Sequence, residues 1–251
     1  MEWKNDLEGA EAVVNLAGRS IDCRHTEENK RQCVESRVTA TKLLGEAIQQ
    51  CVVPPKVWLN ASAIGYYGNR GDEIITENSA AGDGFVSEIC KQWEKTFWQS
   101  ETRHTRKVVF RIGVVLATEG GALQQLARLT RVFLGGKAGS GNQYLSWIHE
   151  EDLVRMVEFA ISENIEGTFN ATAPNPETNK NFMSALRQVV GVPFGIPAAA
   201  WMIKGGAPVI GTEADLILQG QQVLPEKMLQ SNFRFKYENL SDALKEILVK
   251  Q

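Results

Sequence analysis

Short apolar runs alternate with longer stretches of helical periodicity along the first half of the chain. Residues 12–16 form an apolar run that closes at Ala17-Gly18, which predicts a buried strand ending in a turn. Residues 29–50 repeat apolar side chains at helical spacing until Pro54-Pro55 forbids continuation. Strands are expected again at residues 57–59 and 107–112. This alternation predicts right-handed crossovers and a doubly wound α/β domain with a parallel sheet.

A helix is expected between the second and third strands. Phe85, Ile89, Trp93 and Phe97 recur at helical spacing and predict its buried stripe, and Glu88, Lys91 and Glu94 are expected to face water.

The second half of the chain has a different texture. Helices are expected at residues 122–134, 152–162, 180–190 and 240–249, a strand at 167–171, a flexible Gly-rich loop at 135–141 and an irregular stretch at 191–211. The change near residue 172 predicts a larger domain over residues 1–172 and a small C-terminal α/β subdomain over residues 173–251.

Composition narrows the class of protein. The 251 residues are 43% hydrophobic and 23% charged, as in ordinary globular domains. The net charge of −3 gives no global reason to expect nucleic acid or an anionic membrane as a partner, and it favours a small-molecule ligand. The opening residues alternate in charge without an apolar core, so no secretory signal is expected and the predicted location is cytoplasmic. The four cysteines contain no CxxC pair, which is typical of structural thiols in a reducing compartment.

Polar and small residues follow the predicted strands. A hydroxyl and two phenols lie in the stretch from Ser62 to Gly68, directly after the second strand, and Arg111 ends the third. In open parallel sheets the ligand crevice lies at the carboxyl ends of the strands, so these groups are placed to meet a ligand. A guanidinium there can bind a phosphate or carboxylate. The alternative interpretation of residues 62–68 is a Gly-rich turn whose tyrosines pack in the core and meet no ligand.

Several motifs in this order resemble the epimerase-like family of atypical short-chain dehydrogenase/reductases. They are VVNLAG, SRVTAT, NASAIGYYG, VVFRIGVVLATEGGAL, GSGNQYLSWIHEEDLV and ATAPNPETN, and VLPEKMLQSNFRFKYENLSDAL resembles the small domain that closes such proteins. Members are labelled sugar-nucleotide epimerases or SulA-like division proteins. The resemblance implies a Rossmann-type fold that binds NADP and an oxidoreductase or epimerase activity.

Two departures from this family stand out. The family opens with a strand, a GGxGxxG turn and a helix that receives the pyrophosphate, and the chain has no such unit before residue 12, so an N-terminally truncated Rossmann domain with weak cofactor binding is expected. Without this unit a central strand of the sheet would have an exposed edge, and pairing through that edge makes a homodimer one expected assembly. The Tyr-x-x-x-Lys pair of the wider superfamily is also absent, as it generally is in this family.

The resemblance assigns roles to individual residues. It implies cofactor contacts for Leu16, Ala17, Gly18, Arg37 and Arg111, a catalytic hydroxyl at Ser62 and a substrate-bordering phenol at Tyr67. His149 is expected to cap or pack at a helix start, because lone histidines there seldom catalyse. No metal-ligand spacing is present in the sequence.

Three hypotheses about function follow. The first is an NADP-dependent epimerase or oxidoreductase with an unidentified small-molecule substrate, in which Ser62 or Tyr67 polarises an oxygen of that substrate. The second is a non-catalytic protein that senses a nucleotide or docks a partner in cell division, which the missing Tyr/Lys pair motivates. The third is a truncated form that cannot bind cofactor normally.

Overall fold

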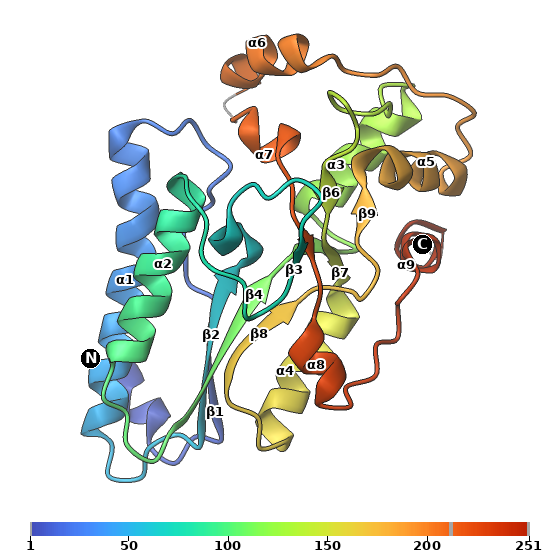
Figure 1. Cartoon of the computed structure of the whole chain (residues 1–251). Coiled ribbons are helices and arrows are strands. Elements are labelled where there is room, and N and C mark those ends of the chain that lie inside the picture. The colour runs from blue at the N-terminus through green and yellow to red at the C-terminus, as the bar shows by residue number, and fades with distance from the viewer. Residues whose placement is uncertain (1, 211–212, 250–251) are drawn as a thin grey trace.

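A four-stranded parallel sheet forms the centre of the protein in the computed structural model, which describes residues 2–210 and 213–249 (Figure 1). The strand order is β1-β2-β4-β8, with non-sequential neighbours joined by helical crossovers. The strands are β1 (Ala12–Asn15), β2 (Val57–Ala63), β4 (Arg106–Ile112) and β8 (Gly167–Ala171). The predicted doubly wound α/β fold is therefore confirmed.

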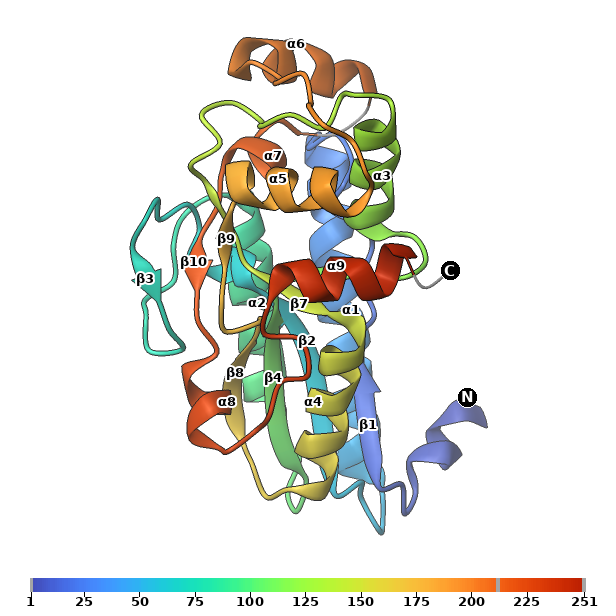
Figure 2. The same cartoon turned by 90° about the vertical axis from the view of Figure 1, so that its right-hand side faces the viewer.

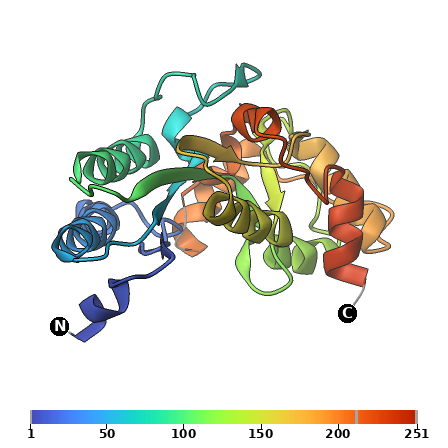
Figure 3. The same ribbon diagram turned by 90° about the horizontal axis from the view of Figure 1, so that it is seen from below.

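Helices cover both faces of this sheet. Helices α1 (Glu27–Gln50) and α2 (Phe85–Gln99) pack together on one face, and α4 (Glu150–Ser162) and α8 (Glu226–Gln230) lie on the other, as the view along the layers shows (Figure 3). The buried strands β2 and β4 are mainly apolar because both of their faces are covered.

Smaller elements extend the carboxyl end of the sheet. They are the 3-10 turn Ile64–Tyr67, the paired strands β3 (Ile74–Ile75) with β10 (Gln222–Val223), β5 (Val114–Leu116) with β7 (Trp147–His149) and β6 (Tyr144–Leu145) with β9 (Glu177–Thr178), and the helices α3 (Gly121–Arg131), α5 (Asn179–Val189), α6 (Ala200–Ile210), α7 (Asp215–Leu218) and α9 (Leu240–Val249). The 3-10 turn Glu2–Leu7 precedes β1 at the opposite end of the sheet, where Leu7 packs with Ala47 and Ile48 at the end of α1. Helices α6 and α7 stand at the end of the molecule above the strand ends (Figure 2).

Apolar clusters join the two parts of the chain that the sequence separates at residue 172. One cluster packs Trp147 with Phe182 and Leu244, and another packs Phe110 with Phe233. The two parts thus share buried surface, and the boundary at residue 172 stays a prediction.

Two expected elements need correction. The stretch expected to be irregular over residues 191–211 contains helix α6, which begins after Pro193 and Pro197 with a first turn that includes the good helix formers Ala200 and Met202. Helix α3 ends at Arg131 instead of residue 134 because Phe133 adopts a left-handed backbone with φ of 65°. No described helix has both the length and the apolar character that crossing a membrane requires.

Candidate functional site

The carboxyl ends of the central strands bring the predicted site residues to one edge of the sheet. The register places Asn15 beside Asn60, Ser62 beside Arg111 and Arg111 beside Asn170. Parallel strands present their carboxyl ends on the same side, which is where open α/β sheets bind ligands. Two polar clusters form along this edge, one after β1 and one around β2 and β4.

The cluster after β1 is organised by Asn15. Its amide donates to Thr41 Oγ1 at 3.0 Å and to Asn60 Oδ1 at 2.6 Å, and its Oδ1 accepts from the backbone N–H of Ala17 at 3.1 Å. These bonds fix the loop that contains the predicted contacts Leu16, Ala17 and Gly18. The Leu16 side chain is 65% exposed, so this loop is open to a ligand.

Arg37 of α1 lies against this loop and has no carboxylate partner among the described residues. Its Nη1 donates to the carbonyls of Arg19 and Cys33, both at 2.9 Å, and its Cζ lies 5.1 Å from the centroid of the Trp93 ring. Burial lowers the pKa of Arg37 from its ordinary value, because desolvation penalises the charged form. A partly buried guanidinium that no acid neutralises attracts an anion.

Gly18 leaves room for that guanidinium. A Cβ at residue 18 would lie 2.9 Å from Arg37 Cζ, closer than real Cβ contacts, so any side chain there would displace Arg37. The small residue and the cation therefore form one cradle at the end of β1.

The second cluster centres on a buried ion pair between Arg111 and Glu94. Arg111 Nε donates to Glu94 Oε1 at 2.9 Å and Nη2 to Oε2 at 2.7 Å, and both side chains are 7% exposed. Burial opposes the charge on Arg111, but the hydrogen bonds and the charge of Glu94 outweigh it and raise the pKa of Arg111. Arg111 therefore brings no unneutralised charge to a ligand, and its predicted cofactor contact stays a prediction.

Ser62 and Tyr67 belong to the same buried network. Ser62 Oγ donates to Glu94 Oε1 at 2.6 Å, and the Tyr67 hydroxyl donates to Asn170 Oδ1 at 2.7 Å and accepts from Arg111 Nη1 at 3.0 Å. Tyr67 is fully buried and burial raises its pKa. The structure thus brings the two predicted catalytic residues together, but their hydroxyls already face internal partners and their catalytic roles stay predictions.

Tyr66 is the phenol of this pair that reaches solvent. Its half-buried ring covers the Arg111 guanidinium, with Cζ 3.4 Å from the ring centroid, and it meets the Tyr67 ring edge-on at 5.4 Å. No hydrogen bond of its hydroxyl to another described residue is present. The sequence placed both phenols at the strand end but could not tell which one the 3-10 turn directs inward.

Glu94 and Asn170 are the site residues that the sequence missed. Glu94 was expected to face water and is instead 5% exposed, because it pairs with Arg111 across the α2–β4 interface. A carboxylate adjacent to Trp93 in the buried stripe, with an arginine at a nearby strand end, was the available signal.

His149 and the cysteines take structural places. His149 is the N-cap of α4, where its Nδ1 accepts from the backbone N–H of Glu151 at 3.1 Å, and its ring stacks on Tyr237. The capping expectation is confirmed. Cys23, Cys33, Cys51 and Cys90 are free thiols, and within residues 2–210 and 213–249 no cluster of His, Cys, Asp and Glu suits a metal ion.

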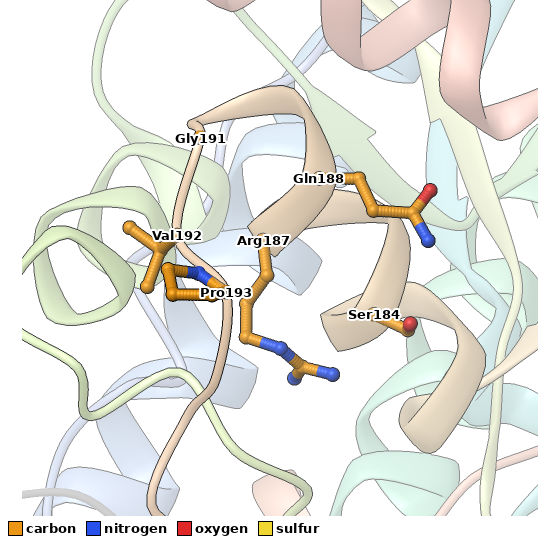
Figure 4. Close-up of a pocket in the computed structure, with 6 residues that line it drawn as sticks. All are labelled: Ser184, Arg187, Gln188, Gly191, Val192 and Pro193. Carbon is orange, nitrogen blue, oxygen red and sulfur yellow. The ribbon is translucent and has the colours of Figure 1, made fainter.

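A separate shallow pocket of about 310 Å³ lies away from the strand ends. Ser184, Arg187 and Gln188 project from α5 beside the turn at Gly191, Val192 and Pro193 that lines its other side (Figure 4). The Arg187 guanidinium donates to the carbonyl of Gly135 at 2.8 Å and so ties this turn region to the loop after α3.

The fold and the polar edge define a Rossmann-type α/β protein with a candidate anion site at the carboxyl end of an outer strand. A family model described as "Domain of unknown function (DUF1731)" matches residues 198–247. The chain is 36% identical to the chloroplastic epimerase family protein SDR39U1 homolog of Arabidopsis thaliana over 98% of this chain and 71% of that protein. It is 36% identical to the epimerase family protein YfhF of Bacillus subtilis, over 98% of this chain and 80% of that protein.

Solved structures agree with these relatives. The human epimerase family protein SDR39U1 (isoform 2), crystallised with NADPH, superposes with a TM-score of 0.92 at 33% identity over 100% of this chain and 86% of that chain. A nucleoside-diphosphate sugar epimerase of Corynebacterium glutamicum superposes with a TM-score of 0.77 at 33% identity, over 98% of this chain and 47% of that chain. The chain belongs to this epimerase family of atypical short-chain dehydrogenase/reductases.

Proposed function

We propose that the protein binds NADP(H) at the carboxyl end of β1 and that Arg37 holds a phosphate of the cofactor. The observation that carries this proposal is the guanidinium itself, partly buried, stacked near Trp93 and without a carboxylate partner among the described residues. A phosphate supplies the missing negative charge and accepts charge-assisted hydrogen bonds. The NADPH in the human relative supports this choice of anion.

The residues around Arg37 fit such a group. Gly18 lets the Arg37 guanidinium lie directly against the loop backbone, and Asn15 fixes the adjoining residues Leu16 and Ala17. Nicotinamide, when bound, supplies or accepts a hydride, which is the chemistry of an oxidoreductase and of an epimerase that works through a keto form.

The second cluster supports a substrate-side role. The guanidinium of the buried Glu94–Arg111 pair packs against the half-buried Tyr66 ring and positions it, and the Tyr66 hydroxyl has no hydrogen-bond partner among the described residues. We infer that Tyr66 meets a small-molecule substrate and that Ser62 and Tyr67 maintain the network that positions it. A positioned phenol can donate a hydrogen bond to a carbonyl or carbinol oxygen.

One observation favours a second candidate function. Both predicted catalytic hydroxyls are occupied by internal partners, at Glu94 and Asn170, which suits a protein that binds the nucleotide without turning over a substrate. Consumption of NADPH across a panel of sugar-nucleotide and small carbonyl substrates separates the two functions, since a sensing protein binds NADPH and leaves it unchanged.

Titration with NADPH tests the proposed function. Arg37→Met should weaken binding about ten-fold or more, because a charge-assisted hydrogen bond contributes about 1.5–3 kcal/mol. Arg31→Met is the matched control on the same helix, since Arg31 is exposed and pairs with Glu28 and Glu35. Equal losses in the two variants would contradict the assignment.

A reducing compartment such as the cytoplasm suits this function. The four thiols are free, with Cys33 and Cys90 buried, and unpaired thiols are typical of reducing compartments. Fractionation of the producing cells checks this location.

A further inference from the structure

The acidic residues of the chain are distributed unevenly. All 30 Asp and Glu residues lie outside residues 120–149 and 178–212, whereas these two segments contain the basic residues Arg128, Arg131, Lys137, Lys180, Arg187 and Lys204. The net charge of −3 therefore conceals a part of the protein that carries only positive charge.

These two segments meet in space and form one surface. The backbone of Phe133 accepts from Ile196 N at 2.8 Å, that of Lys137 from Ala198 N at 3.0 Å, and that of Ala198 from Gly139 N at 2.8 Å. Helix α6 continues directly from this ladder and stands at the end of the molecule in both side views (Figures 1 and 2).

Large apolar side chains are exposed on this surface, which we name the acid-free face. Its apolar members are Phe133, Leu134, Phe194, Ile196, Trp201 and Met202, all at least 41% exposed and Trp201 75% exposed. Six exposed large apolar side chains on two paired segments are unusual on a soluble monomer and mark an interaction site.

The backbone holds one of these aromatic rings outward at a conformational cost. Phe133 adopts φ of 65°, a region that bulky residues avoid, and its ring stacks on Phe194 with centroids 4.9 Å apart. The fold thus presents the aromatic pair to solvent although glycine would suit this position better.

Basic side chains are available beside the apolar members. Arg131, Lys137 and Lys204 are exposed and form no ion pair with the described residues. Glu213, the first acid after the second segment, already accepts from the backbone N–H of His25 at 2.8 Å.

We propose that the acid-free face docks on the surface of an anionic lipid bilayer, with the aromatic and aliphatic side chains in the interface and the three basic residues at lipid phosphates. Protein surfaces that lie in the membrane interface typically combine Trp and Phe side chains with flanking Lys and Arg. The charge pattern disfavours a second copy of the chain, because an isologous pair would bring the same unneutralised cations together.

Flotation of the full chain with phosphatidylcholine vesicles containing phosphatidylglycerol tests this proposal. We expect binding to these vesicles, little binding to pure phosphatidylcholine, and loss of binding at high salt. Replacing Arg131, Lys137 and Lys204 together by Gln should reduce partitioning roughly 100-fold, since each basic residue near such a surface contributes roughly five-fold. Trp201→Ser with Phe194→Ser should reduce it as well.

Matched controls keep the test specific. Trp98→Ser removes an exposed Trp on α2, and Lys56→Gln removes an exposed cation elsewhere, and both should bind vesicles like the parent. Circular dichroism must show all variants folded. Equal binding to neutral and anionic vesicles, or unchanged binding in the triple variant, would overturn the proposal. So would a parent that ignores vesicles but forms a dimer that Trp201→Ser dissociates, or one captured only by an acidic peptide.

Discussion

Arg111 and Glu94 form a two-pronged ion pair inside the protein, with donor–acceptor distances of 2.9 and 2.7 Å. The pair links α2 to β4, and it also engages the hydroxyls of Ser62 and Tyr67, so one interaction fixes two of the three hydroxyls that the sequence placed at the second strand end. If the main role of this pair is to hold the network in place, then removing one of its charges should reduce the stability of the fold.

Glu94→Gln should lower the free energy of unfolding by about 3–5 kcal/mol, because it leaves the buried Arg111 charge without a counter-ion. Denaturant unfolding measures this change. Glu11→Gln is the control, since Glu11 pairs with Lys56 on the surface, and such pairs contribute about 0–1 kcal/mol. A loss below about 1 kcal/mol for Glu94→Gln would contradict the structural role.

Replacing both partners should be less damaging than replacing one. Glu94→Leu with Arg111→Met removes both buried charges and leaves apolar groups of similar size, so its stability should exceed that of Glu94→Leu alone. The same denaturant titrations give the coupling energy of the cycle. Additive losses would indicate that the two side chains act independently.

Cys90 should resist alkylation in the folded protein. Burial raises its pKa to about 11, and its side chain is 2% exposed, so little thiolate is present at pH 8 and reagents cannot reach it. Mass spectrometry after brief iodoacetamide treatment should find Cys90 unmodified until the protein unfolds.

Replacing all four cysteines should change NADPH affinity by no more than a few-fold, and abolished binding in a folded variant would contradict this.

Gly18→Ala should weaken NADPH binding without unfolding the protein. The new Cβ would meet the mobile end of Arg37 at 2.9 Å and move the guanidinium from its place. Gly205→Ala is the matched control, because a Cβ at residue 205 has no neighbour within 4 Å and Ala favours a helix. In calorimetry, Gly205→Ala should bind NADPH with the affinity of the parent, and Gly18→Ala should bind it more weakly.

Periodic patterns were sufficient to predict the sheet and its flanking helices. Strands β2 and β4 are short apolar runs between breakers, and α1 begins beside the Thr26 cap and ends near Pro54-Pro55. Helix α6 was not predicted because Gly205, Gly206 and Pro208 disfavour a helix. Its first turn, Ala200 to Ile203, is too short to produce a helical pattern in the sequence. Two-residue strands such as β3 and β9 depend on tertiary pairing and leave no pattern in the sequence.

The sequence predicted where the site residues lie better than it predicted what each of them does. Strand ends placed Ser62, Tyr67 and Arg111 at one edge, because sheet topology fixes that edge, whereas Arg37 on α1 was assigned by the family resemblance. Which arginine lacks a counter-ion depends on Glu94, a residue that helical periodicity placed in water. Pairing across elements is a property of three-dimensional packing, so the charge state of each candidate could only come from the structure.

Isothermal titration of NADPH into the parent, Arg37→Met and Arg31→Met tests the central claim most directly. We predict saturable binding by the parent, unchanged affinity for Arg31→Met, and a loss of about ten-fold or more for Arg37→Met in a variant that circular dichroism shows to be folded. Equal affinity of the parent and Arg37→Met would contradict the claim that the unneutralised guanidinium at the end of β1 is the phosphate site.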